Sequence, residues 1–71
     1  MRMQRVSSEA AEAIGYDPGR QWLDVRYTTG SATYRYLDVP AAVYAELRSA
    51  PSVGTYLNQR VKPHYRYIVL R

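Results

Sequence analysis

The last third of the sequence combines basic and aromatic side chains and contains no acidic residue. Five of the ten lysine and arginine residues lie after Glu46, and no aspartate or glutamate does. The side chains near the end that could contact a nucleic acid are Arg60, Lys62, His64, Tyr65, Arg66, Tyr67 and Arg71. Cations bind phosphates and aromatic rings stack on unpaired bases, so this segment predicts binding to RNA, either tRNA or a single strand. The alternative is that the cations are merely solvated and that the two tyrosines pack in an edge strand.

Arg35 and Trp22 could extend such a surface from a neighbouring sheet face, because guanidinium and indole planes also stack on bases. The run Tyr34-Arg35-Tyr36 offers the same chemistry. Its two tyrosines, however, are expected on the strand face that the helices would cover. We therefore expect Tyr34 and Tyr36 to belong to the core, and Tyr65 and Tyr67 to be the more accessible pair.

The sequence offers little for catalysis or metal binding. The absence of cysteine excludes a thiol nucleophile and a thiolate metal site, and a single histidine excludes a histidine cluster. A hydrolase that uses Ser7 or Ser8 with His64 is a weaker alternative, because no local motif supports it. No glycine-rich loop precedes a helix, so a phosphate-binding loop is also excluded. We expect no catalytic residue, no bound metal and no cofactor.

Length and charge set further bounds. The 71 residues, 8.2 kDa in mass, are expected to form one domain over residues 1–71, since domains typically have about 100–150 residues. The formal net charge of +4 arises after Glu46, because residues 1–46 carry five basic and six acidic side chains. The longest uncharged stretch, Ser49 to Gln59, is far shorter than the roughly 20 apolar residues of a membrane span. The first residues also lack the apolar run of a secretory signal, so we expect a cytoplasmic protein with no membrane partner.

Thr29-Gly30 separates two runs that are rich in tyrosine and β-branched residues, which predicts a hairpin. A two-residue turn there places Leu23 opposite Tyr36 on one face of the sheet. On the other face it pairs Asp24 with Arg35, and opposite charges across two strands are favourable. The apolar face and the charge pair agree on one register.

An earlier hairpin is predicted at Asp17-Pro18-Gly19, because proline fixes φ at the second position of a turn and glycine accepts a positive φ at the third. A two-residue turn there places Ile14 opposite Leu23. It also places Gly15 opposite Trp22, where a glycine would leave room for the indole ring.

Two short helices are predicted after the hairpins. The first begins near Pro40, with Asp38 close enough to serve its free N–H groups. The second has Ser52 or Ser49 as its N-cap. Gly54 inside the second helix indicates that another part of the chain comes close there, since glycine is unfavourable in a helix.

Residues 65–70 form a short β-like run that predicts a further strand. The order of two hairpins, two helices and a strand is typical of an α+β fold. The expected architecture is therefore a small antiparallel sheet packed against two short helices.

Several short runs together form a recognisable pattern. They are Val6-Ser7-Ser8, Ile14-Gly15-Tyr16-Asp17, Leu23-Asp24-Val25, Gly30, Tyr34-Arg35-Tyr36, Val39-Pro40-Ala41-Ala42-Val43-Tyr44, the stretch 50–58, Val61-Lys62 and Tyr65. With this pattern the chain resembles, over about residues 6–69, the KTSC domain, a small family found at the C-terminus of some lysyl-tRNA synthetases and alone in bacterial and phage proteins. The resemblance implies a fold and a suggested RNA-binding role, and it implies no catalytic residue. Leu57 departs from the pattern, which usually has an aromatic residue there.

Two functions follow from these observations. The first is a small non-catalytic module that binds RNA through its basic, tyrosine-containing end. The alternative is a module for protein–protein interaction or self-association, because a domain of this size cannot bury eight tyrosines and exposed Tyr and Trp favour interfaces. The placement of Arg60, Lys62, Arg66 and Arg71 distinguishes the two: cations that share a face with Trp22 or Tyr67 favour RNA binding, and scattered cations count against it.

Overall fold

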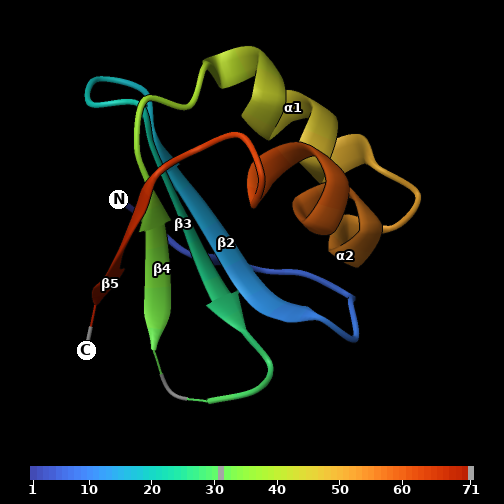
Figure 1. Cartoon of the computed structure of the whole chain (residues 1–71). Helices are drawn as coiled ribbons and strands as arrows, with labels where there is room; N and C mark the ends of the chain where they lie inside the picture. Colours follow the sequence, from blue (N-terminus) through green and yellow to red (C-terminus); the bar gives the residue numbers. More distant parts are fainter. Residues whose placement is uncertain (31, 71) are drawn as a thin grey trace.

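The structure, a computed structural model, describes residues 1–30 and 32–70. Five antiparallel strands form one sheet in the order β1-β2-β3-β4-β5. The strands are β1 (Gln4–Arg5), β2 (Ala11–Asp17), β3 (Trp22–Tyr27), β4 (Thr33–Tyr36) and β5 (Tyr67–Leu70). Between β4 and β5 lie the helices α1 (Ala41–Ser49) and α2 (Val53–Tyr56), and α2 continues into the π-helical turn η1 (Leu57–Val61). Figure 1 shows the helices packed toward β2 and β3, with β5 at an edge of the sheet. The expected small α+β fold with a sheet and two short helices is confirmed.

The register of the second hairpin is confirmed. Leu23 lies opposite Tyr36 and Asp24 lies opposite Arg35. The last described pair of this ladder is Arg26 with Thr33, in the same register. The apolar face and the charge pair had therefore fixed the pairing correctly, while the turn itself includes position 31, outside the described residues.

The predicted register of the first hairpin is wrong by two residues. Tyr16, and not Ile14, lies opposite Leu23, and Gly15 lies opposite Asp24 rather than beneath an indole ring. A shift of two residues leaves the alternation of side chains unchanged, since that alternation has period two. The side chains of this strand therefore lie on the faces that were expected.

The cause of the shift is a turn of four residues, 18–21, in place of two. Oδ1 of Asp17 accepts hydrogen bonds from the backbone N–H groups of Gly19, at 2.9 Å, and Arg20, at 3.2 Å. Gln21 adopts a positive φ of 57° before the second strand begins. The aspartate side chain thus supports a longer turn than the Pro-Gly pair alone indicates.

The core lies between the sheet and the helical segment. Its buried residues are Ala11, Ile14, Leu23, Val25, Tyr36, Val39, Leu47, Leu57 and Val61. A Cβ atom added at Gly54 would lie 2.9 Å from the Cβ of Ala10, so the predicted close approach to this helix is confirmed. Helix α2 therefore packs directly on the segment that leads into β2.

One of the two predicted helix caps is present. Oγ of Ser52 accepts a hydrogen bond from the N–H of Thr55 at 3.2 Å, as expected for an N-cap. The prediction for Asp38 is wrong, because the N-cap of α1 is Pro40 and no side chain caps it. Asp38 has a positive φ of 56°, and its carboxylate lies instead 3.3 Å from Nη2 of Arg66.

Candidate functional site

A recess of about 430 Å³ opens on the face of the sheet that carries the helices. The six residues that line it are Tyr27, Thr29, Tyr34, Tyr36, Lys62 and Tyr67. We call this site the tyrosine recess. It combines four aromatic rings with one cation, which suits a planar ligand that carries a negative charge.

Strand alternation places the rings of β3 and β4 in the tyrosine recess. Leu23 and Val25 point to the same face of β3 and are fully buried. Tyr27 follows them on that face at the end of the strand, where it is only partly buried. Tyr34 and Tyr36 face the same side from β4, because they lie opposite Val25 and Leu23.

Tyr67 from β5 completes the aromatic wall. Its ring centroid lies 5.1 Å from that of Tyr34 and 5.8 Å from that of Tyr36, and the rings of Tyr27 and Tyr34 meet edge to face at 5.4 Å. These separations lie in the favourable range for aromatic pairs. Because Tyr67 is still 52% exposed, its ring is both supported by its neighbours and open to a ligand.

The polar side-chain groups of the tyrosine recess are four phenol hydroxyls, the hydroxyl of Thr29 and the amine of Lys62. The hydroxyls of Tyr27 and Tyr36 lie 2.7 Å apart and share a hydrogen bond. Burial raises the pKa of both phenols, and for Tyr27 the hydrogen bond to Tyr36 raises the pKa further, so both are neutral at physiological pH. Nζ of Lys62 lies 4.9 Å from the centroid of the Tyr27 ring. None of the ion pairs within residues 1–30 and 32–70 includes Lys62, so its charge faces solvent.

Three of the residues singled out from the sequence lie elsewhere. Arg60, His64 and Tyr65 line a second recess of about 410 Å³ together with Glu46 and Tyr56. The hydroxyl of Tyr56 donates a hydrogen bond to Oε1 of Glu46 at 2.7 Å there. This recess shares no lining residue with the tyrosine recess, and it contains a carboxylate of its own.

The other residues that were predicted near the C-terminus also lie apart from one another. Arg66 is exposed and pairs with Asp38, and Arg71 lies outside the described residues. Tyr67 is the accessible tyrosine that was expected, whereas Tyr65 is partly buried against the core. The expected core role is confirmed for Tyr36, while Tyr34 is partly buried and lines the recess.

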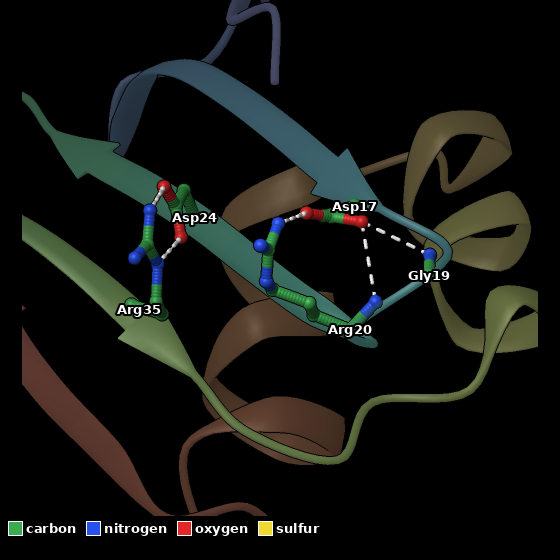
Figure 2. A network of polar contacts seen from close by, with 5 residues as sticks. All are labelled: Asp17, Gly19, Arg20, Asp24 and Arg35. Atoms are coloured by element: carbon green, nitrogen blue, oxygen red, sulfur yellow. Dashed lines mark hydrogen bonds and ion pairs between the residues drawn. The ribbon is translucent and has the colours of Figure 1, made fainter.

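Arg35 and Trp22 lie on the opposite face of the sheet, away from the helices. Nε and Nη2 of Arg35 donate to the two carboxylate oxygens of Asp24 at 2.9 and 3.0 Å, as Figure 2 shows. These hydrogen bonds raise the pKa of Arg35. Its guanidinium carbon lies 4.1 Å from the centroid of the Trp22 ring. Figure 2 also shows Arg20 bound to Asp17 beside this pair. The guanidinium of Arg35 is therefore already occupied, and it does not join Lys62 and Tyr67.

The serines and the histidine of the weaker hydrolase alternative do not meet. Ser7 and Ser8 line a third recess beside α2, and Oγ of Ser8 accepts a hydrogen bond from the N–H of Ala10 at 3.1 Å. His64 lines the second recess. Within the described part of the chain, no group of three or more His, Cys, Asp or Glu side chains could hold a metal ion. In the same residues, no helix has the length and apolar character needed to cross a bilayer.

Four residues of the tyrosine recess were not among the predicted site residues: Tyr34 and Tyr36 had been assigned to the core, and Tyr27 and Thr29 were missed. Tyr27 could have been found, because it follows Leu23 and Val25 on one face of a strand whose register was predicted correctly. Thr29 gave no such signal, since it lies in the loop beyond the ladder.

Comparison with known sequences decides the family. The sequence profile of the KTSC domain matches residues 7–65, which is most of the chain. The chain belongs to the KTSC domain family. The expected resemblance is therefore confirmed, with somewhat narrower bounds than residues 6–69.

Other KTSC proteins agree with this assignment. A protein from Tsukamurella paurometabola is 48% identical over 96% of this chain and 100% of its own length. A segment of a lysine–tRNA ligase from a Nostoc species is 38% identical over 79% of this chain but only 10% of that enzyme. A crystal structure of a KTSC domain protein from Yersinia pestis superposes with a TM-score of 0.94 at 30% identity, covering 99% of this chain and 97% of that one. The fold described above is thus the KTSC fold.

Proposed function

We propose that this KTSC domain is a non-catalytic module that binds single-stranded RNA in the tyrosine recess. The observation that carries the proposal is the combination, in one recess, of an exposed tyrosine supported by other rings and an amine that forms no ion pair within residues 1–30 and 32–70. Single-strand binding proteins use aromatic platforms for the bases and cations for the backbone. The recess volume of about 430 Å³ is sufficient for one nucleotide.

Tyr67 is the stacking platform in this proposal. The residue is 52% exposed, and the contact of its ring with the ring of Tyr34 at 5.1 Å orders it before a base arrives. A platform that is already ordered loses little conformational entropy on binding. A base that stacks on such a ring gains about 1–3 kcal/mol.

Lys62 supplies the attraction for the phosphate. Its amine lies 4.9 Å from the Tyr27 centroid and lines the same recess as Tyr67, so one nucleotide could place its base on the rings and its phosphate near the amine. The hydrogen-bonded hydroxyls of Tyr27 and Tyr36 and the hydroxyl of Thr29 offer partners for a base edge. One of the two phenols donates to the other, which leaves the second hydrogen free for a ligand.

A relative supports RNA as the ligand. The Nostoc enzyme that carries a similar segment is named for its tRNA substrate. The segment makes up a tenth of that enzyme, which fits an accessory role beside a larger catalytic body.

The experiment is a titration of fluorescently labelled single-stranded RNA of about eight nucleotides, a common site size, followed by anisotropy at several salt concentrations. Tyr67→Ala is expected to weaken binding by about 5- to 150-fold, the equivalent of one lost stacked base, whereas Tyr67→Phe keeps the ring and is expected to bind nearly as tightly as the wild type. Lys62→Gln is expected to reduce the slope of log K against log salt by about 0.7.

Arg48→Gln is the matched control for charge. Arg48 is an exposed cation on α1 whose guanidinium carbon lies 5.7 Å from the Tyr44 ring, and it does not line the tyrosine recess. If Arg48→Gln weakens binding as much as Lys62→Gln, the interaction is a general attraction to positive charge and the proposed site is wrong. Absence of binding at low salt overturns the proposal itself. A folded tRNA, titrated in parallel, is expected to bind less tightly than the single strand, because its bases are mostly stacked.

A further inference from the structure

Strand β5 has one free edge. It pairs only with β4, and within residues 1–30 and 32–70 no other strand lies beside it. Three consecutive large apolar residues of this strand are exposed, namely Tyr67 at 52%, Ile68 at 47% and Val69 at 38%. Natural sheets usually protect such edges with charges, prolines or bulges, and residues 67–70 contain none of these. The other edge strand, β1, is only two residues long and carries Gln4 and an arginine.

The hydrogen bonds of the β4–β5 ladder identify the backbone groups at this edge. The N–H of Leu37 donates to the C=O of Arg66 at 2.8 Å, and these two residues continue the register in which Tyr36 faces Tyr67. Hydrogen-bonded residues alternate along an antiparallel strand. Ile68 therefore bonds to β4, whereas the N–H and C=O groups of Tyr67 and Val69 point outward from the sheet.

We propose that β5 pairs antiparallel with β5 of a second copy of this chain, around a twofold axis at Ile68. In this register Tyr67 lies opposite Val69 of the second copy, and Val69 lies opposite Tyr67 of the second copy. Each pair exchanges two N–H···O bonds, so all eight outward backbone groups of the two strands are paired. A register centred on Tyr67 places Val69 opposite Tyr65 of the second copy, whose N–H already donates to the C=O of Val61 in its own chain. Among the described residues, a register centred on Val69 pairs only Val69 with itself.

The side chains of the two strands also match in this register. Ile68 packs against Ile68 of the second copy on the outer face of the sheet, and Tyr67 packs against Val69 of the second copy on the face of the recess. Like pairs of apolar and aromatic side chains across strands are favourable. Arg66, the described cation that directly precedes this strand, is paired with Asp38 within its own chain, and residues 67–70 carry no charge at the centre of the interface.

A second copy fits this edge better than RNA does. A row of alternating N–H and C=O groups is complementary to another extended backbone, and RNA has no such backbone. The strand carries no charge between positions 67 and 70, so the edge offers nothing that selects an acidic peptide over another copy of the same apolar strand. The paired sheets would have ten strands, with both tyrosine recesses on the same face.

Sedimentation equilibrium of the full chain at increasing concentration tests the proposal. A contact of this size is weak, since stable interfaces bury more than about 1,000 Å², so the average mass is expected to rise from 8.2 kDa toward twice that value between about 10 μM and 1 mM. Added salt is expected to strengthen the association, because it screens the repulsion between two chains of net charge +4. RNA binding in the tyrosine recess responds to salt in the opposite direction, so the two proposals can fail separately.

Two kinds of variant test the edge and its register. Val69→Pro removes an outward N–H that makes no bond to β4, so the monomer keeps its ladder while the pairing is lost. Val69→Thr keeps that N–H and is the matched control. Ile68→Lys and Ile68→Glu each place like charges on the twofold axis and are expected to be monomers, whereas an equimolar mixture of the two is expected to form a one-to-one heterodimer.

The outcomes are distinct. A wild-type chain that remains a monomer to about 1 mM overturns the proposal, and so does a dimer that Val69→Pro leaves unchanged. A wild-type dimer whose two Ile68 variants do not associate with each other overturns the register centred on Ile68. Far-ultraviolet circular dichroism on each variant shows that the monomer is folded in every comparison.

Discussion

Removal of Arg35 is expected to cost this small domain a large part of its stability. The carboxylate of Asp24 is 7% exposed and accepts two hydrogen bonds from Arg35, whose own side chain is 21% exposed. Arg35→Gln leaves that carboxylate nearly buried and without its cation. The loss of one partner of a fully buried pair costs about 3–5 kcal/mol, and partial access of water to Arg35 reduces the value here to about 2–3 kcal/mol. Loss of the stacking on Trp22 at 4.1 Å contributes about 0.5–1 kcal/mol of this.

Such a loss is easily measured. A domain of this size has a free energy of unfolding of only about 4–10 kcal/mol. A change of 1 kcal/mol shifts its melting temperature by about 4–8 °C, so Arg35→Gln is expected to lower the melting temperature by about 10–20 °C. Asp24→Asn is expected to cost less, about 1–2 kcal/mol, because the guanidinium left behind is better solvated and still covers Trp22.

The double variant Asp24→Asn/Arg35→Gln provides the control. It removes both charges together, so its loss of stability is expected to be smaller than the sum of the two single losses by at least about 1 kcal/mol. Urea unfolding followed by tryptophan fluorescence gives all three values, with Trp22 as the single indole. If Arg35→Gln costs less than about 0.5 kcal/mol, or if the single losses simply add, the pair does not stabilise the sheet as argued.

Three other predictions concern the turns and helices. Gly54→Ala is expected to destabilise the chain despite its gain of about 1 kcal/mol in helix propensity, because the new Cβ would lie 2.9 Å from the Cβ of Ala10. Adding Ala10→Gly to the same chain is expected to recover the lost stability, as measured by urea unfolding. Burial and the hydrogen bond to Glu46 raise the pKa of Tyr56 to about 12. The stability that the neutral phenol of Tyr56 contributes is therefore present below pH 10 and is lost as the pH rises toward 12. Alkaline titration of phenolate absorbance in the wild type and in Tyr56→Phe measures the pKa. The hydrogen bond from the backbone N–H of Arg20 lowers the pKa of Asp17. Asp17→Ala is therefore expected to destabilise the chain at neutral pH, and this difference from the wild type is expected to vanish as the pH falls below the ordinary pKa range of an aspartate. Thermal melts at neutral and acidic pH measure the difference.

A strand register could be predicted where two independent residue patterns indicated the same pairing. The register of β3 and β4 followed from an apolar face and from the Asp24–Arg35 pair together. The register of β2 and β3 depended on turn residues alone, and the side chain of Asp17 supports a turn of a different length. Strand β1 gave no pattern, because its two residues, Gln4 and an arginine, are both exposed.

The candidate site was predicted only in part for a related reason. Lys62 and Tyr67 were found by their types, but residues adjacent in sequence leave a strand in opposite directions and leave a helix in several. Tyr27 and Tyr34 come from segments far from the basic end and meet Tyr67 only through the pairing of β4 with β5. A run of cations and aromatics therefore indicates a chemistry without showing which of its members share a surface.

The cations near the C-terminus do not all line one site, and this sets the salt dependence expected for RNA binding. Of the four described cations after Glu46, Lys62 alone lines the tyrosine recess; Arg60 lies in another recess and Arg66 pairs with Asp38. Each phosphate contact to a single strand contributes about 0.7 to the slope of log K against log salt, so five cations acting together would give a slope of about −3.5. The geometry of the described residues predicts a slope between about −0.7 and −1.4, for one or two contacts. A measured slope near −3.5 would show that RNA follows the charge of the whole basic end, and the tyrosine recess would then not be where the chain binds it.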